Sequence, residues 1–255
     1  MSEVINSVAA LLDEAAHRAQ AVEQCSVKTP FSVEQAYEIQ RKSIDLRCQR
    51  GEQRVGIKLG FTSRAKMIQM GVDSLIWGWL TDKMVQEEGG QVAMSQYIHP
   101  RAEPELCFIT KRDIDRPLNL LEVADYLEAV APAIEIIDSR YKNFKFTLED
   151  VVADNCSSSG LVVGPWSSKL EDWGQRGVLL EVNGRVVQAG STAAILGHPL
   201  RSIVQASKVL HQSECVLPAG SLIMAGAATA AESFTAGQHI AVKISGLDGA
   251  SYHAI

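Results

Sequence analysis

Two glutamates stand close together in the segment HPRAEPELCFI, residues 99–109. If this segment is a strand, Glu103 and Glu105 point to the same face, because side chains alternate along a strand. Neighbouring carboxylates repel each other, and one is driven toward its protonated form unless a cation lies between them. The pair therefore predicts a cation-binding patch, although glutamates with this spacing are also common on the water-exposed face of a strand.

A third acid, Glu135, lies in the segment APAIEIID, residues 131–138, with apolar neighbours on both sides. We expect a strand here and a helix over residues 118–131, so that a strand–helix–strand path returns Glu135 to the first pair. Asp138 could instead be a surface acid. Three carboxylates without a nearby histidine form an all-oxygen ligand set, which favours Mg²⁺ or Mn²⁺ over zinc.

A lysine stands between apolar residues in GIKLGFTSRAKMIQMGV, residues 56–72. In a buried strand, loss of water would lower the pKa of Lys58 and make it an acid–base group, whereas a nearby anionic cluster would keep it charged. A strand lysine that faces water is the alternative interpretation.

The elements that must position these residues begin with two helices, expected over residues 4–24 and 33–49. Ser32 is a good N-cap for the second helix, with Gln35 as its capping-box partner. A strand over 54–61 carries the lysine, and a short helix is expected over 63–71. The amphipathic spacing that predicts the helix over 118–131 comes from Leu121, Ala124, Leu127 and Val130.

Strands dominate the C-terminal third of the sequence. The pair Asn183-Gly184 between two alternating segments is a strong hairpin signal. A helix is expected over residues 201–212, and further strands over 220–228 and 237–246. We predict an α+β protein with a small helical N-terminal part, residues 1–50, and a catalytic mixed-β domain, residues 51–255.

The composition excludes several classes of partner. The chain has 255 residues and a net charge of −6, and it contains no basic stripe of the kind that binds nucleic acid. No apolar segment approaches the roughly 20 residues that span a membrane, and the N-terminus lacks a signal-peptide pattern, so the expected location is cytoplasmic. Five cysteines without a CxxC pair predict reduced thiols rather than a disulfide framework.

Taken together, these segments resemble the fumarylacetoacetate hydrolase superfamily. The resemblance is carried by the segments GIKLGFTSRAKMIQMGV, RAEPELCFI, AIEIIDSRY, DNCSSSGLVVG and GSLIMAGAAT. They are most similar to the branch that contains the 2-hydroxypentadienoate hydratases and 4-oxalocrotonate decarboxylases of aromatic meta-cleavage pathways. The fold that this resemblance implies is the mixed β-sheet or β-roll core of the family's C-terminal domain.

The resemblance also implies roles for individual residues. Glu103, Glu105 and Glu135 would hold Mg²⁺ or Mn²⁺, and Lys58 would be catalytic. The residues implied to contact the substrate are Leu59, Ser157, Ser159 and Thr229.

The choice between the two activities of this branch depends on one position. As the resemblance aligns them, hydratases of the branch carry an aspartate just before an aromatic–glycine pair, and here Ile76 occupies that place in DSLIWG. In an alignment shifted along this loop, Asp73 or Asp82 would supply the acid instead. The expected reaction is therefore metal-dependent decarboxylation of 2-oxo-3-hexenedioate, a small dicarboxylate, to 2-hydroxypenta-2,4-dienoate and CO₂. A 2-hydroxypenta-2,4-dienoate hydratase, an acylpyruvate hydrolase, and a non-catalytic subunit of a decarboxylase–hydratase complex are the alternatives. The resemblance further implies a homo-oligomer that can associate with the pathway hydratase.

Overall fold

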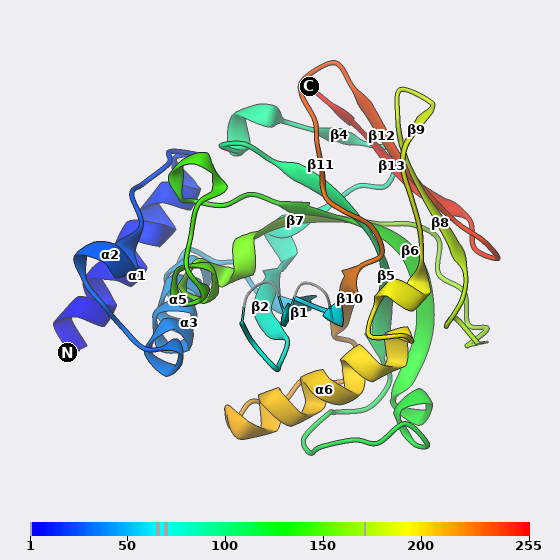
Figure 1. Ribbon diagram of the computed structural model, residues 1–255, viewed down its shortest axis with the longest axis horizontal. Coiled ribbons are helices and arrows are strands. Elements are labelled where there is room, and N and C mark those ends of the chain that lie inside the picture. The colour runs from blue at the N-terminus through cyan, green and yellow to red at the C-terminus, as the bar shows by residue number, and fades with distance from the viewer. Residues whose placement is uncertain (1, 65–66, 69–70, 171) are drawn as a thin grey trace.

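The protein folds into two β-sheets with helices gathered mainly at one side, as Figure 1 shows. The computed structural model describes residues 2–64, 67–68, 71–170 and 172–255. Its helices are α1 (Ser2–His17), α2 (Cys25–Lys28), α3 (Val33–Gln49), α5 (Leu148–Ala153) and α6 (Pro199–Gln212). Its strands are β1 (Arg54–Gly60), β2 (Ile76–Thr81), β3 (Val85–Gln86), β4 (Gln91–Val92), β5 (Arg101–Thr110), β6 (Leu127–Ile137), β7 (Ser158–Val163), β8 (Gly177–Val182), β9 (Arg185–Ser191), β10 (Leu222–Ala227), β11 (Glu232–Ser233), β12 (His239–Ile244) and β13 (Gly249–Ala254).

The larger sheet has the strand order β2-β1-β10-β5-β6-β7-β3, and β11 pairs with one end of β5. Most of its neighbours are antiparallel, but β1 runs parallel to β10, and β3 runs parallel to β7. The smaller sheet has the order β4-β13-β12-β8-β9. The α+β class with a mixed-sheet core is thereby confirmed.

The main hydrophobic core lies between the two sheets. Ile134 and Ile136 of β6 pack with Val242 of β12 and Tyr252 of β13, and all four are buried. Helix α6 adds Leu210 to the same core. Burial of this apolar surface is the dominant stabilising contribution and fixes the frame in which β5 and β6 lie.

A second core joins the N-terminal helices to the rest of the chain. Leu12 of α1, Ile39 of α3 and Val152 of α5 are buried together. Helix α3 begins with the predicted capping box of Ser32 and Gln35. Helix α1 ends at His17 rather than at residue 24, and Ala19 just beyond it takes a left-handed φ of 49°.

The helix expected over residues 118–131 is wrong. Leu121 is 97% exposed, one 3₁₀ turn covers Val123–Tyr126, and strand β6 begins at Leu127. The apolar residues that suggested a helix continue into a nearly unbroken apolar segment that contains Pro132, which a helix interior does not accept. Pairing with the long strand β5 decides the conformation, so β5 and β6 are direct antiparallel neighbours with no intervening helix.

Other expected elements are present. Asn183 and Gly184 take φ values of 51° and 72° between β8 and β9, as a two-residue hairpin turn requires. The helix near 201–212 and the strands near 54–61, 220–228 and 237–246 correspond to α6, β1, β10 and β12.

Three further expectations concern the helix over residues 63–71, the state of the thiols and membrane-spanning segments. Within the range 63–71, residues 65–66 and 69–70 lie outside the described part of the chain. All five cysteines are free thiols. Among the described residues, the helices are too short or too polar to cross a lipid bilayer.

Candidate metal centre and active-site cavity

The three predicted glutamates meet on one face of the β5–β6 pair. Glu103 lies directly opposite Glu135 in the antiparallel register, and Glu105 follows Glu103 by one strand period. One carboxylate oxygen from each residue lies within 4.8 Å of the others. The register of two neighbouring strands therefore builds the cluster.

Pro104 stands between the two glutamates at a place where the sheet is irregular. The sequence favours an edge strand or a bulge there. Strand β5 is central, between β10 and β6, but the pairing of β10 with β5 shifts between Met224 and Ala227, close to Pro104. Inside this irregularity, Gly226 donates its backbone N–H to Glu105 Oε2 at 2.8 Å. Gly226 has a φ of +112°, and a Cβ atom there would lie 2.0 Å from the hydroxyl of Thr62, so only glycine fits.

The cluster is buried and electrostatically unbalanced. Glu105 and Glu135 are 1% and 0% exposed. In the described part of the chain, Oε1 of each of these two carboxylates has no hydrogen-bond partner. Burial raises the pKa of Glu105 well above its ordinary range, and repulsion from Glu135 and Glu103 adds to this; burial also raises the pKa of Glu135. Buried, unpartnered carboxylate oxygens that converge on one point fit a divalent cation with oxygen ligands.

Lys58 lies at the edge of this cluster. Its Nζ is 3.3 Å from Glu135 Oε2 and donates a hydrogen bond to the backbone oxygen of Cys156 at 3.0 Å. Burial alone would lower the pKa of Lys58, but the carboxylates of Glu135 and Glu103 outweigh it and leave the pKa above its ordinary value. Lys58 is therefore a buried ammonium group, not a lysine that faces water.

Lys58 and Glu103 open into a cavity of about 640 Å³. Among the substrate contacts implied by the sequence, Leu59, Ser157 and Thr229 line this cavity. The hydroxyl of Ser157 is buried and has no hydrogen-bond partner among the described residues, so it is available to a ligand. Much of the remaining wall is apolar and includes Phe61, Ile76, Phe144, Phe146 and Val151.

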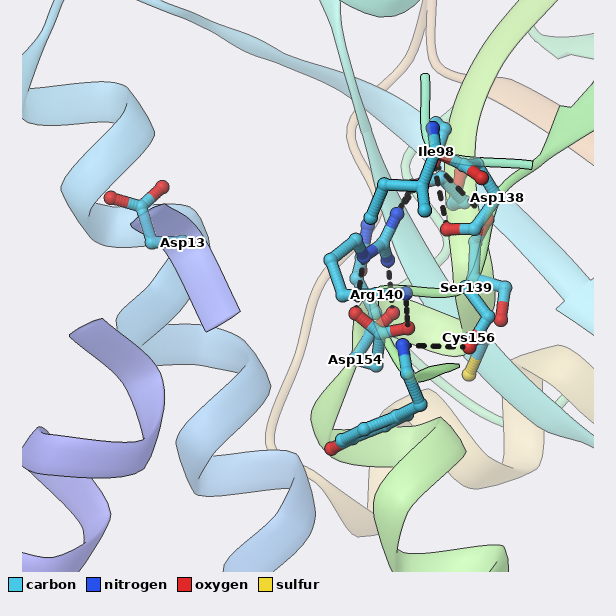
Figure 2. Close-up of polar contacts among 12 residues, drawn as sticks. Asp13, Ile98, Asp138, Ser139, Arg140, Asp154 and Cys156 are labelled. Atoms are coloured by element: carbon cyan, nitrogen blue, oxygen red, sulfur yellow. Dashed lines mark hydrogen bonds and ion pairs between the residues drawn. The ribbon is translucent and has the colours of Figure 1, made fainter. Parts of the chain in front are cut away.

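Ser159 lies apart from this cavity. Its hydroxyl contacts the guanidinium of Arg140 and the backbone oxygen of Asp138. Figure 2 shows this polar cluster, in which Arg140 forms a buried ion pair with Asp154. These contacts show that Ser159 links the start of β7 to Arg140 and Asp138, and it does not line the cavity.

Asp138 belongs to the same cluster and is not a surface acid. It is 3% exposed, and its two carboxylate oxygens accept the backbone N–H groups of Ile98 and His99, each at 2.8 Å. It ties the segment before β5 to the end of β6, beside the glutamate cluster.

Sequence reasoning missed several groups at the site. Arg101 lines the cavity from β5 and lies 4.3 Å over the ring of Phe144. Its position two residues before Glu103 is a usable signal, because the same alternation places it on the face that carries the glutamates. Asn155 and Gln40 carry no comparable signal, because their partners are backbone groups distant in sequence.

Comparison with known sequences identifies relatives over most of the chain. A sequence model of the fumarylacetoacetate (FAA) hydrolase C-terminal family matches residues 64–250. A 4-oxalocrotonate decarboxylase from Pseudomonas sp. is 47% identical over 248 residues, which cover 97% of each chain. A 2-hydroxypent-2,4-dienoate hydratase from Pseudomonas putida is 36% identical over 184 residues, which cover 71% of this chain and 83% of the hydratase.

Comparison with solved structures gives the same relationship. The 4-oxalocrotonate decarboxylase from Pseudomonas putida G7, complexed with magnesium and adipate, superposes with a TM-score of 0.97 and 37% sequence identity. The match covers 100% of this chain and 98% of that structure. The similarity therefore extends through the N-terminal helices as well as the β-sheets.

Proposed function

The chain belongs to the fumarylacetoacetate hydrolase family, and on that premise we propose that it is a 4-oxalocrotonate decarboxylase. It would convert 2-oxo-3-hexenedioate to 2-hydroxypenta-2,4-dienoate and CO₂. The relative with 47% identity is named for this activity. The matched structure holds adipate, a six-carbon dicarboxylate of the same chain length as this substrate.

The residues that line the cavity are the observation that favours decarboxylation over hydration. Hydration of a diene needs a general base that activates a water molecule, whereas loss of CO₂ needs no attacking water and only a proton donor for the enolate. The described residues that line the cavity include no aspartate and no histidine, and the ionisable side chains among them are those of Lys58, Arg101, Glu103 and Cys156. Ile76, the residue that the resemblance aligns with the aspartate of the hydratases, lines the cavity with an apolar group.

The glutamate cluster gives the substrate its binding position. Glu103, Glu105 and Glu135 would hold the Mg²⁺ or Mn²⁺ ion. The bound ion would supply Lewis acidity to the 2-oxo group and compensate the charge of the neighbouring carboxylate. The hydroxyl groups of Ser157 and Thr229 lie in the same cavity and are suited to hold substrate oxygens.

The bond changes follow from the substrate's conjugation. The bond between C5 and the departing C6 carboxylate breaks, and its electron pair forms the C4–C5 double bond. The C3–C4 double bond moves to C2–C3, and the 2-oxo oxygen becomes an enolate. Lys58 Nζ places a positive charge beside the developing anion and can deliver the one proton that the product enol needs.

The apolar part of the wall favours departure of the carboxylate. Phe61, Ile76 and Phe144 offer little solvation to a charged carboxylate but accept neutral CO₂ well. A cavity with these side chains also keeps bulk water from the reactive dienolate. Both effects raise the rate of decarboxylation relative to hydration.

We also propose that the protein is a cytoplasmic homo-oligomer and that it can associate with the hydratase that consumes its product. The product is an unstable dienol, so direct transfer to the next enzyme would limit its loss. Sedimentation of the protein alone and mixed with such a hydratase measures both forms of association. A protein that sediments as a monomer and does not bind the hydratase would contradict this part of the proposal.

The activity is tested by incubating the protein and Mg²⁺ with 2-oxo-3-hexenedioate and, separately, with 2-hydroxypenta-2,4-dienoate. Released CO₂ and ultraviolet absorbance are followed in each reaction. Release of CO₂ from the first compound without hydration of the second is the expected result. Hydration of the second compound alone would identify a hydratase and would contradict the role given to Ile76.

A further inference from the structure

The turn Asn155–Ser157, which precedes β7, has an uncommon backbone conformation. Three successive residues other than glycine take left-handed φ values, of 48° at Asn155, 52° at Cys156 and 58° at Ser157. L-residues rarely adopt this region, and a run of three persists only when surrounding contacts hold it. The turn borders the cavity through Cys156 and Ser157, so its conformation bears directly on the active site.

Partners of the backbone carbonyls around this turn show what it does. The oxygen of Asp154 accepts hydrogen bonds from Ser157 N and from the guanidinium of Arg140. The oxygen of Ser157 accepts from Asp138 N at 2.8 Å. The oxygen of Cys156 accepts from Lys58 Nζ. The left-handed turn thus directs one carbonyl at the catalytic ammonium group, while other groups tie down the carbonyls on either side.

The side chain of Asn155 fastens this turn to β2. Its Oδ1 accepts the backbone N–H of Trp79 at 2.7 Å, and its Nδ2 donates to the backbone oxygen of Trp79 at 2.9 Å. The amide therefore pairs with β2 as a neighbouring strand would. Asn155 is 5% exposed, so water does not compete for these two bonds.

Gly78 provides the space that lets the turn lie against β2. A Cβ atom on Gly78 would lie 2.5 Å from the backbone oxygen of Asn155. In the register of β1 with β2, Gly78 is the residue opposite Lys58. The turn therefore lies on the sheet directly beside the lysine that its carbonyl holds.

We propose that Asn155 is a positioning residue for the decarboxylation, because its amide clamp on Trp79 and the gap at Gly78 hold the Cys156 carbonyl against Lys58. This role rests on the proposed function of Lys58. It does not require Asn155 to touch the substrate, and its effect should pass through the lysine.

The main test is the variant Asn155→Gly, which removes the amide but still accepts a left-handed backbone. Asn183→Gly is the matched control, because Asn183 also has a left-handed φ and accepts a backbone N–H, from His239, in the distant hairpin. Steady-state kinetics are measured for both variants with Lys58 present and in a Lys58→Ala background. We expect Asn155→Gly to lower kcat by about 10- to 100-fold with Lys58 present, as a small misplacement does. In the Lys58→Ala background the further loss should be less than about threefold, because the two changes remove the same effect.

A second readout does not depend on activity. The nitrogen–proton correlation spectrum of lysine ammonium groups should show Lys58, whose protons are buried and hydrogen-bonded, and the signal is assigned by its absence in Lys58→Ala. It should persist in Asn183→Gly and be lost or shifted in Asn155→Gly, while Mn²⁺ affinity stays unchanged. If Asn155→Gly does not fold, Gly78→Ala displaces the same turn from the other side and should give the same two results.

Two results would overturn the proposal. One is an equal loss of kcat in both lysine backgrounds, which would make Asn155 a general structural support. The other is an unchanged Lys58 signal in Asn155→Gly. If the unaltered protein proves inactive as a decarboxylase, the proposed function fails, but the ammonium spectrum still decides whether Asn155 positions Lys58.

Discussion

At the scale of single residues, the site places one ammonium group beside three carboxyl groups. Lys58 stays protonated because Glu135 and Glu103 offset the cost of burying its charge. A metal ion would take over the carboxylates and leave the ammonium group free to face the substrate's developing negative charge. In the proposed mechanism Lys58 acts on the reaction, whereas the glutamates hold the ion.

Replacing Lys58 by alanine separates these two roles. Lys58→Ala should bind Mn²⁺ and lose about 10²- to 10⁴-fold in kcat, the range typical of a lost proton donor. Kinetics and a Mn²⁺ titration measure the two effects. Lys243→Ala is the control, because Lys243 also lies on a strand and pairs with a glutamate, Glu181, at an exposed site. Normal turnover by Lys58→Ala would remove this lysine from the mechanism.

Replacing Glu105 by glutamine should abolish metal binding and activity together. Glu105→Gln removes one charged ligand and also the repulsion from Glu135, so the metal-free variant should be at least as stable as the unaltered protein. Calorimetric titration with Mg²⁺ and urea unfolding test the two statements. Glu128→Gln is the control on β6, where the side chain faces water. Full activity in Glu105→Gln would contradict the metal assignment.

Metal affinity should depend on pH. The raised pKa values of Glu105 and Glu135 mean that the folded, metal-free protein holds a proton where an unfolded chain would not. That proton favours the folded state at low pH, and its contribution is lost as pH rises through the folded-state values. An entering cation must displace it, so metal affinity should increase as pH rises through the raised pKa values of these two carboxyl groups. Mn²⁺ titrations in buffers of different ionisation enthalpy measure the released proton, and an affinity independent of pH would argue against this coupling.

At the scale of secondary-structure elements, helix α3 supports the site from outside the sheets. Its residue Gln40 is 1% exposed and donates to the backbone oxygens of Trp77 on β2 and Val152 on α5. These two elements flank the turn that holds Lys58. The N-terminal helices therefore contribute to the architecture of the site as well as to the second core.

Gln40→Leu should destabilise the protein by about 2–4 kcal/mol, because two buried carbonyls lose their donor. Urea unfolding measures the change. Gln49→Leu, at the exposed end of the same helix, should change stability by less than about 0.5 kcal/mol. Equal stability of the two variants would show that α3 contributes apolar packing only.

The sequence predicted elements best where the signal was local. The capping box of Ser32, the hairpin turn at Asn183 and the alternation around Glu103 depend on residues within a few positions of one another. The segment around Leu127 was misread because its apolar residues fit both periodicities and its partner strand is remote in sequence. The ligand set needed only that Glu135 return to β5, and direct antiparallel pairing achieves this more simply than the crossover that we expected.

The contacts that hold Lys58 could not be predicted from the sequence, for a different reason. The segment DNCSSSG drew attention for its serines, yet Asn155 makes the clamp and Ser159 contacts Arg140. Side chains that form hydrogen bonds with backbone groups remote in sequence produce no periodic pattern of residue types. Only the assembled sheet shows which carbonyl they reach.

At the scale of the whole molecule, the metal should act as a stabilising ligand. The cluster lies on the central strands β5 and β6, so unfolding must destroy it. Mg²⁺ at about 100 times its dissociation constant adds about 2.7 kcal/mol to stability, which corresponds to a rise of several degrees in Tm for a chain of this size. Thermal scans with and without Mg²⁺ measure the shift. It should vanish in Glu105→Gln and persist in Glu128→Gln.

The register that places Glu103 opposite Glu135 also makes the site sensitive to whether a strand gains or loses an odd or an even number of residues. Side chains alternate between the faces of a strand, so adding or removing one residue inside β5 or β6 turns every residue beyond it to the other face. An odd change of length inside these strands would therefore turn at least one of the three carboxylates away from the others unless a bulge absorbed it. Changes of length can accumulate in the connection between the two strands, residues 111–126, without moving Glu103, Glu105 or Glu135 relative to one another.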